Sequence, residues 1–157
     1  MIVVADTSPL NYLILIDAIH VLPALYQRVV IPSSVHQELT HPGSPEQVSA
    51  WAFNLPDWCD VRSPSSMPDP SLALLDEGER DAIQLAIDSG INTILMDEIT
   101  GRREAIRRHL QVSGTIAVLE KGAQRGLINF RAAFQSLERT NFRISSALRA
   151  EFFGRNP

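Results

Sequence analysis

Short apolar runs alternate with longer segments of helical periodicity along the chain, a pattern typical of α/β proteins. Strands are predicted at residues 2–5, 29–31, 59–61, 93–96 and 111–113. Helices are predicted at residues 8–17, 21–26, 76–89, 100–109, 115–124, 130–139 and 145–153, and two more follow Pro32 and Ser44. Strands separated by helices favour a three-layer α/β/α sandwich with a central parallel sheet of four to five short strands.

The composition is that of an ordinary globular protein of one domain. The chain has 157 residues, of which 45% are hydrophobic and 20% are charged. A net charge of −4 excludes a global basic field that would attract nucleic acid. A nucleic-acid enzyme stays open, because a metal ion and local arginines can supply positive charge at the site itself.

The sequence lacks signals for export or membrane insertion. Cys59 is the single cysteine, so no internal disulfide can form. Met1 leads directly into the first strand rather than into a signal peptide, and no apolar stretch approaches the roughly 20 residues of a membrane helix. We therefore expect a cytoplasmic protein that does not associate with a membrane.

Two of the predicted strands end on an aspartate. Residues 2–5 are followed by Asp6, and residues 93–96 are followed by Asp97. Parallel α/β sheets bind ligands outside the carboxyl ends of their strands, so both side chains are expected to face a site. The alternative for Asp6 is a turn or helix-cap residue. That alternative is weaker because Ser8, which precedes a proline, is expected to cap the first helix.

Glu79 projects from the apolar side of the helix predicted at residues 76–89. The polar face of that helix carries Glu77, Arg80, Asp81, Gln84 and Asp88. The apolar face carries Ala82, Ile83, Ala86 and Ile87. A carboxylate on the apolar side is costly unless it is paired or bound to a metal. The alternative, a first-turn acid favoured by the helix dipole, explains the position of Glu79 but not its face.

Glu38 is a weaker candidate because its helix is short. It lies one turn after Val35 and beside Leu39, on the packed side, although an exposed glutamate at a helix end is an equal alternative. Convergent carboxylates repel by about 4 kcal/mol per close pair. A hard divalent cation such as Mg²⁺ or Mn²⁺ would stabilise them, since it prefers oxygen ligands. The four histidines show no zinc-binding spacing.

The order of these acids resembles that of the PIN-domain ribonucleases, the family of the VapC toxins. Such domains carry Asp-Thr-Ser or Asp-Ser-Ser at the end of the first strand, and residues 6–8 are Asp-Thr-Ser. A glutamate follows on a helix after the second strand, a third acid precedes x-x-Ala-Ile, and a fourth acid ends the next strand. Glu38, Glu79 and Asp97 match these positions. The third acid is Glu here, where many PIN domains have Asp.

A bacterial and archaeal PIN subfamily is similar through four short motifs. They read Asp-x-Ser-Pro-Leu, Gly-Glu-x-x-Ala-Ile, Asp-x-x-x-Gly-Arg and Gly-Thr, and the chain matches them at residues 6–10, 78–83, 97–102 and 114–115. The resemblance covers about residues 1–128. We expect residues 1–128 to form a PIN-like nuclease domain, and the helices of residues 129–157 to pack on the same domain.

The resemblance implies an endoribonuclease that hydrolyses RNA phosphodiester bonds with Mg²⁺ or Mn²⁺ as cofactor. It implies that the metal ligands and catalytic residues are Asp6, Glu38, Glu79 and Asp97. It further implies the toxin of a toxin–antitoxin pair, with a separate antitoxin chain as partner, and a homodimer. The first helix has more apolar residues than one buried stripe requires, which fits either core packing or a dimer.

Several neighbouring residues are candidates for supporting roles. Thr7, Ser8 and Thr115 are expected to orient a ligand or water, although Thr115 is equally explained as a plain helix cap. Arg102 and Arg103 begin a local basic patch that is expected to contact the RNA backbone. A solvated helix face is an equal alternative for that patch.

Two other functions compete with the nuclease. One is a catalytically silent PIN-like module that binds nucleic acid or a partner protein. The other is an Mg²⁺-dependent phosphohydrolase or receiver domain, which also places aspartates at strand ends. A phosphohydrolase of the haloacid dehalogenase type requires Asp-x-Asp after the first strand, and Ser8 stands at the second of these positions.

Overall fold

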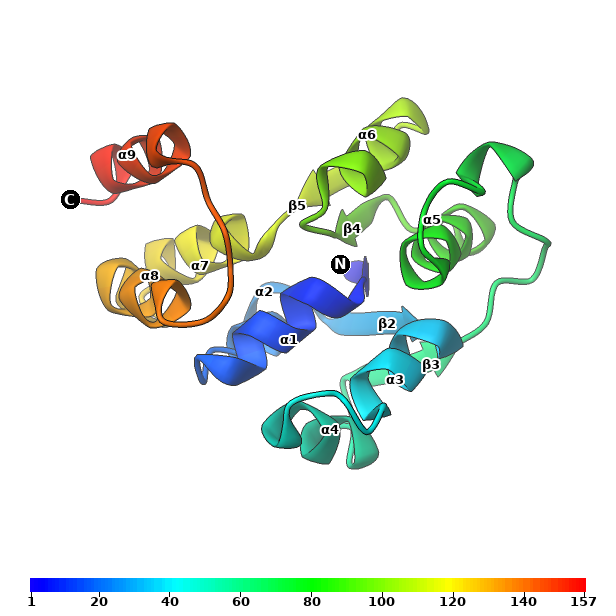
Figure 1. Cartoon of the computed structure of the whole chain (residues 1–157), viewed down its shortest axis with the longest axis horizontal. Helices are drawn as coiled ribbons and strands as arrows, with labels where there is room; N and C mark the ends of the chain where they lie inside the picture. The colour runs from blue at the N-terminus through cyan, green and yellow to red at the C-terminus, as the bar shows by residue number, and fades with distance from the viewer.

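A five-stranded parallel sheet lies at the centre of the molecule (Figure 1). The computed structural model describes all 157 residues. Its strands are β1 (Ile2–Ala5), β2 (Arg28–Pro32), β3 (Cys59–Arg62), β4 (Thr93–Leu95) and β5 (Gln111–Ser113). Their order across the sheet is β3-β2-β1-β4-β5. From β1 the chain adds β2 and β3 on one side, and it then crosses to the other side of β1 to add β4 and β5. The strand order therefore reverses between β1 and β4, and parallel sheets bind ligands at such a point.

Nine α-helices connect or follow these strands. They are α1 (Thr7–Leu15), α2 (Val21–Leu25), α3 (Ser33–Thr40), α4 (Glu46–Phe53), α5 (Glu77–Ser89), α6 (Ile99–Arg107), α7 (Thr115–Gln124), α8 (Phe130–Glu138) and α9 (Ser146–Arg155). A short 3₁₀ turn, Pro70–Leu72, interrupts the long loop before α5. The predicted three-layer α/β architecture is confirmed. No helix combines the length and hydrophobicity needed to cross a bilayer.

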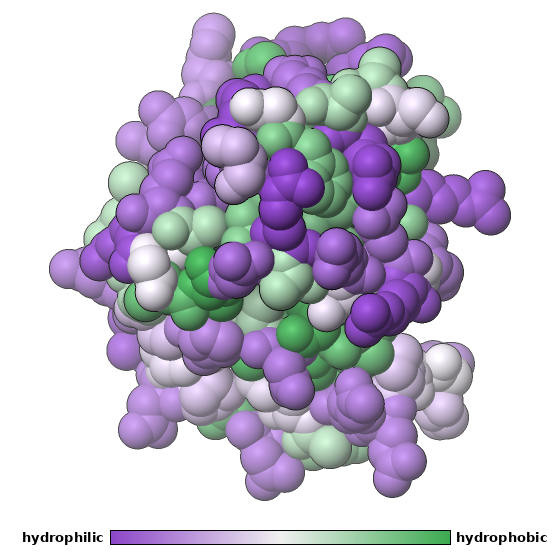
Figure 2. Space-filling model, turned by 90° about the vertical axis from the view of Figure 1, so that its left-hand side faces the viewer, coloured by the Kyte–Doolittle hydropathy of each residue, from purple (hydrophilic) through white to green (hydrophobic).

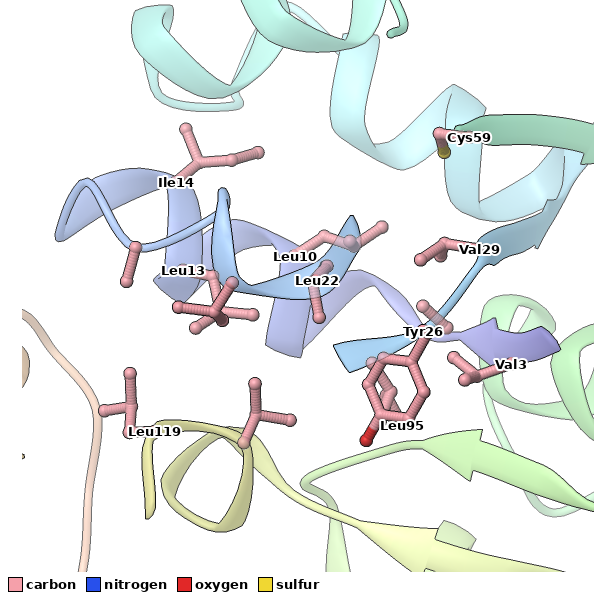
Figure 3. Close-up of a cluster of buried hydrophobic side chains, with 14 of the residues drawn as sticks. Val3, Leu10, Leu13, Ile14, Leu22, Tyr26, Val29, Cys59, Leu95 and Leu119 are labelled. Atoms are coloured by element: carbon pink, nitrogen blue, oxygen red, sulfur yellow. The ribbon is translucent and has the colours of Figure 1, made fainter. Parts of the chain in front are cut away.

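The sheet buries both of its faces, because successive strand residues point to opposite sides. Val3 and Ala5 join a large core under α1, α2, α3, α4, α7 and α8, whereas Val4 joins a smaller core under α5 and α6. Figure 3 shows the larger core, in which Leu10 and Leu13 of α1 gather with Leu22 of α2 and with strand residues such as Val29. The apolar side chains of α1 thus pack within the chain, so they favour the core over the dimer explanation.

The first helix begins one residue earlier than predicted. Asp6 occupies the N-cap position, and Ser8 lies inside the helix instead of capping it. The Ser8 hydroxyl donates a hydrogen bond to Asp97, 2.9 Å away, so a contact across the sheet replaces the local cap. The Asp6 side chain makes no capping hydrogen bond either, which leaves its carboxylate available to the site.

Helix α5 has clear boundaries but a different polar face from the predicted one. The Asp76 carboxylate accepts from the backbone N–H of Glu79 at its start, and Gly90 ends it in the left-handed region at φ 66°. Gln84 is buried, because its amide bonds the loop before the helix, and Ile87 is exposed. The helical periodicity had placed Gln84 on the exposed face and Ile87 on the buried face, and both placements were wrong. The long loop before α5 covers the side with Gln84 and leaves Ile87 uncovered.

The last two helices cover the larger core. Phe134 of α8 is fully buried and packs against Phe130 and Phe153, with the ring centroids of Phe134 and Phe153 4.8 Å apart. Phe142 and Ile144, between α8 and α9, also pack on this core. Figure 2 views the side on which α8 and α9 lie in Figure 1, where hydrophilic residues surround a smaller group of hydrophobic ones. Phe130, Phe134 and Leu137 are buried, so α8 turns its apolar side inward.

Candidate active site

A polar pocket of about 490 Å³ opens beside β1 and β4, where the strand order reverses. Its lining consists of Asp6, Thr7, Ser8, Asn11, Tyr12, Glu38, Asp76, Glu79, Asp97, Glu98, Asn141, Phe142 and Arg143. Six of these residues are acidic. All four carboxylates predicted from the sequence therefore meet in one pocket, although α3, α5 and the ends of two strands supply them.

Asp6 directly follows β1 and is buried, with 6% of its surface exposed. Its backbone N–H donates to the carbonyl of Leu95, which fixes the start of α1 against β4. Burial raises the pKa of Asp6 to about 7; the backbone N–H of Thr7 opposes this shift, and the charges of Asp76, Glu38 and Asp97 add to it. The carboxylate therefore holds a proton more tightly than an exposed aspartate does.

Glu79 lies on the buried side of α5, as its helical position predicted. Burial raises the pKa of its carboxyl well above the usual range, and Asp76, Asp6 and Glu98 raise it further. Asp81, an acid on the polar face of the same helix, forms an ion pair with Arg80 at 3.1 Å and does not line the pocket. Glu79 is thus the acid that α5 directs into the site.

Asp97 follows β4 and is held by three hydrogen bonds. The Ser8 hydroxyl and the Thr115 hydroxyl donate to Oδ2 at 2.9 and 2.6 Å, and the backbone N–H of Thr115 donates to Oδ1 at 2.7 Å. The N-cap position of α7 belongs to Gly114, so Thr115 is not the plain cap that was the alternative. Ser8 and Thr115 both act on one carboxylate, and they fix its orientation toward the pocket.

Glu38 lines the pocket from α3, but its side chain is exposed rather than packed. Partial burial raises the pKa of its carboxyl, as do the charges of Asp76 and Glu77, whereas the nearby Thr7 hydroxyl lowers it. The Thr7 hydroxyl itself is buried and has no partner within hydrogen-bonding geometry. A buried hydroxyl without a partner, next to carboxylates, can coordinate a cation or hydrogen-bond an ordered water.

Three glycines stand directly against the carboxylates. A Cβ at Gly78 would lie 2.5 Å from Glu38 Oε1 and 3.3 Å from Asp6 Oδ1, and one at Gly101 would lie 2.9 Å from Glu79 Oε2. A Cβ at Gly114 would lie 2.8 Å from Asp97 Oδ1. Because glycine has no side chain, these three positions leave room for the carboxylates. Each of the three glycines belongs to one of the short motifs found in the sequence.

The sequence analysis missed several parts of the lining. Asp76 was read only as the start of a helix, and it both caps α5 and lines the pocket. Glu98, which directly follows Asp97, was not singled out and also lines the pocket. Asn141, Phe142 and Arg143 come from a segment without any motif; the only signal is that apolar Phe142 and Ile144 flank Arg143, which turns the arginine outward.

The predicted basic patch on α6 is partly neutralised. Arg107 and Arg108 pair with Glu104, at 3.0 and 2.6 Å. Arg102 is half-buried and donates to the carbonyl of Met96, so it braces the end of β4. Arg103 is exposed and forms no ion pair. Neither Arg102 nor Arg103 lines the pocket, and their contact with nucleic acid stays a prediction.

The donor chemistry of the pocket fits a hard divalent cation. Its carboxylate oxygens and the unsatisfied Thr7 hydroxyl are ligands that Mg²⁺ and Mn²⁺ prefer. In the structure no three Asp, Glu, His or Cys side chains converge closely enough to hold a metal ion. A bound divalent cation would offset the repulsion between those carboxylates that are ionised.

The raised pKa of Asp6 predicts an unusual pH dependence of stability without metal. The folded state binds this proton more tightly than the unfolded state, so stability is fully present below about pH 4 and is lost as the pH rises to about 7. The loss amounts to on the order of 4 kcal/mol, since each pKa unit corresponds to about 1.4 kcal/mol. Urea unfolding in EDTA across this range should show the loss in the wild type.

Asp6→Asn serves as the reference for that measurement. This variant keeps the shape of the side chain but has no proton to lose, so the difference in unfolding free energy between the two proteins should change with pH. A difference that is constant across the range would contradict the prediction.

The fold and the pocket define a class of α/β protein with a carboxylate-lined site at the carboxyl edge of a parallel sheet. A family model described as a PIN domain matches residues 2–155, and the chain therefore belongs to the PIN-domain family. A search of curated proteins finds no match to it. PIN domains are generally nucleases and typically bind divalent metals, so this is a fold of the nuclease type.

Proposed function

We propose that this protein is an endoribonuclease that hydrolyses RNA phosphodiester bonds with Mg²⁺ or Mn²⁺. The observation that carries the proposal is the meeting of Asp6, Glu38, Glu79 and Asp97 in one pocket at the reversal of the strand order. These residues come from four separate segments of the chain. A cluster of like charges at this point of the sheet is costly for stability, so a function that uses a cation explains it better than folding does.

The pocket residues fall into groups with different roles in the proposed hydrolysis. A bound divalent cation would lower the pKa of a water molecule and stabilise the charge that develops on the phosphate. Asp6, Glu38, Glu79 and Asp97 would hold it with their oxygens. Ser8 and Thr115 keep the Asp97 carboxylate in place, and the free Thr7 hydroxyl can accept or donate one further hydrogen bond. Hydrolysis would give 5′-phosphate and 3′-hydroxyl ends.

The resemblance to PIN-domain toxins supports a more specific role. We propose that the protein acts in the cytoplasm as the toxin of a toxin–antitoxin pair, with a separate antitoxin chain that covers the pocket. It would work as a homodimer. Leu10 and Leu13 of α1 are buried in the core and are therefore not available to a dimer interface. Co-expression with the neighbouring open reading frame and sedimentation of the purified protein test these two points.

A catalytically silent PIN-like module is the second candidate. The carboxylates line one pocket but do not converge on a single point, which favours this reading. Binding of Mn²⁺ without cleavage of RNA would support it over the nuclease.

Asp97→Asn is the variant that tests the proposal. We expect wild-type protein to cleave RNA with Mn²⁺ or Mg²⁺ and to stop in EDTA, and we expect the variant to lose roughly 100-fold or more of this activity. Mn²⁺ should also raise the unfolding free energy of the wild type, by about 2.7 kcal/mol at a hundredfold excess over Kd, but not that of the variant. Cleavage that survives in the variant would contradict the assignment.

A further inference from the structure

The segment between α8 and α9, which we call the connector (residues 139–145), closes one part of the pocket. Asn141, Phe142 and Arg143 contribute to the pocket lining from this segment. The Tyr12 hydroxyl of α1 donates to Asn141 Oδ1 at 2.7 Å, and the ring of Tyr12 meets that of Phe142 edge-on at 4.9 Å. The connector therefore contacts α1 directly at the pocket, through this hydrogen bond and this pair of rings.

The chain alternates across this part of the connector. Phe142 and Ile144 are half-buried on the larger core, whereas Asn141 and Arg143 are exposed. The backbone N–H of Phe142 also bonds the Thr140 hydroxyl, at 3.1 Å. The two apolar side chains thus fix the backbone, and this fixation sets the direction in which Arg143 projects.

Arg143 is the single cationic residue in the pocket lining, and six lining residues are acidic. It takes part in none of the ion pairs of the molecule, although Arg28, Arg62, Arg80, Arg107, Arg108, Arg149 and Arg155 all do. An acidic pocket repels a polyanionic substrate unless a cation of the protein faces it. The guanidinium group suits this task, because its planar fork matches a phosphate.

The remaining residues near Arg143 differ chemically from the carboxylates. Asn11 and Asn141 offer amide groups, and Tyr12 and Phe142 are the only aromatic residues of the lining. Amides can bond the edges of a base, and aromatic rings can pack against its face. Bases are accessible in this way in single-stranded RNA but not inside a duplex. The pocket thus has a carboxylate wall and a second wall suited to a nucleotide.

We propose that α1 and the connector form a substrate-binding wall, in which Arg143 holds a backbone phosphate of single-stranded RNA next to the carboxylates. This inference rests on the proposed nuclease function, and it names the residue and the segment that bind the substrate. The phosphate bound by Arg143 neighbours the one that is cleaved, so Arg143 is a binding residue and not a catalytic one.

Arg143→Ala tests this role, with Arg139→Ala as matched control. Arg139 is exposed, forms no ion pair and lies at the start of the connector, but it does not line the pocket. Binding of a short fluorescein-labelled single-stranded RNA is measured in EDTA by anisotropy at several salt concentrations. Arg143→Ala should weaken binding by roughly 10-fold, as expected for one charged hydrogen-bonding contact. It should also reduce the slope of log K against log salt by about 0.7.

The control and the cleavage assay separate the two proposals. Arg139→Ala should bind as the wild type does, and Arg143→Lys should restore part of the affinity. With Mn²⁺, Arg143→Ala should raise KM more than it lowers kcat, and duplex RNA should compete poorly. If Arg143→Ala and Arg139→Ala had equal effects on the affinity and on the salt slope, the proposed substrate-binding wall would be wrong. The nuclease proposal would remain intact. Selective loss of binding in a protein that never cleaves RNA would overturn the nuclease alone. A wild type that binds no RNA in EDTA and cleaves none with Mn²⁺ would overturn both.

Discussion

Gly78→Ala is expected to lose about 100-fold of metal-dependent RNA cleavage while the protein stays folded. The added methyl group would lie 2.5 Å from Glu38 Oε1, so the Glu38 carboxylate has to move away. It can do so because Glu38 is exposed, and the displacement costs the fold little. A shift of about 1 Å in a catalytic group can reduce a rate on the order of 100-fold. The change therefore separates the geometry of the site from the stability of the chain.

Gly154→Ala is the matched control. Both glycines lie in α-helices, where alanine gains up to about 1 kcal/mol of helix propensity over glycine. A Cβ at Gly154 meets nothing within 4 Å, so this variant should keep full activity. Thermal unfolding with EDTA and with Mn²⁺ should show that Gly78→Ala is stable but responds less to the metal. Full cleavage by Gly78→Ala would mean that Glu38 does not need its present position.

Phe134→Ala should lower the unfolding free energy by about 3–5 kcal/mol, the usual cost of truncating a buried aromatic side chain. Phe134 of α8 is fully buried, beside Phe130 of the same helix and against Phe153 of α9. Its removal leaves a cavity that a tightly packed core cannot refill. We expect one cooperative transition in urea, shifted to lower concentration, because the C-terminal helices and the sheet share one core.

Phe53→Ala provides the comparison for that measurement. Phe53 is 69% exposed, so its truncation should change stability by no more than about 0.5 kcal/mol. Two separate transitions in Phe134→Ala would instead mean that residues 129–157 unfold as a unit of their own. An effect below about 1 kcal/mol would show that the site collapses around the missing ring.

The layers of the fold could be predicted from the sequence, because apolar residues follow a different spacing in strands than in helices. Strands of a sheet that is buried on both faces form continuous apolar runs, and these runs identified β1 and β4. The same runs placed Asp6 and Asp97 at the carboxyl edge. The helical period placed Glu79 on the buried side of α5, since an acid on that side breaks an otherwise regular pattern.

Other parts of the site depend on contacts that no local pattern encodes. Ser8 looked like a helix cap, and it bonds Asp97 instead, because β4 brings that carboxylate within reach. The direction of Arg102 depends on the path of the chain after β4. The connector entered the pocket without a motif, since its position follows from the packing of α8 and α9 on a core far away in sequence.

The distance along the chain between the two walls also sets the order in which the pocket is assembled during synthesis. Tyr12 and Asn141, which bond in the folded protein, are 129 positions apart. Chains leave the ribosome from the N-terminus and fold progressively. When α7 has emerged, all four carboxylates are present but the wall with Arg143 is still missing. The order of synthesis thus leaves an interval in which a ribosome-bound chain has all four carboxylates but lacks the proposed RNA-binding wall.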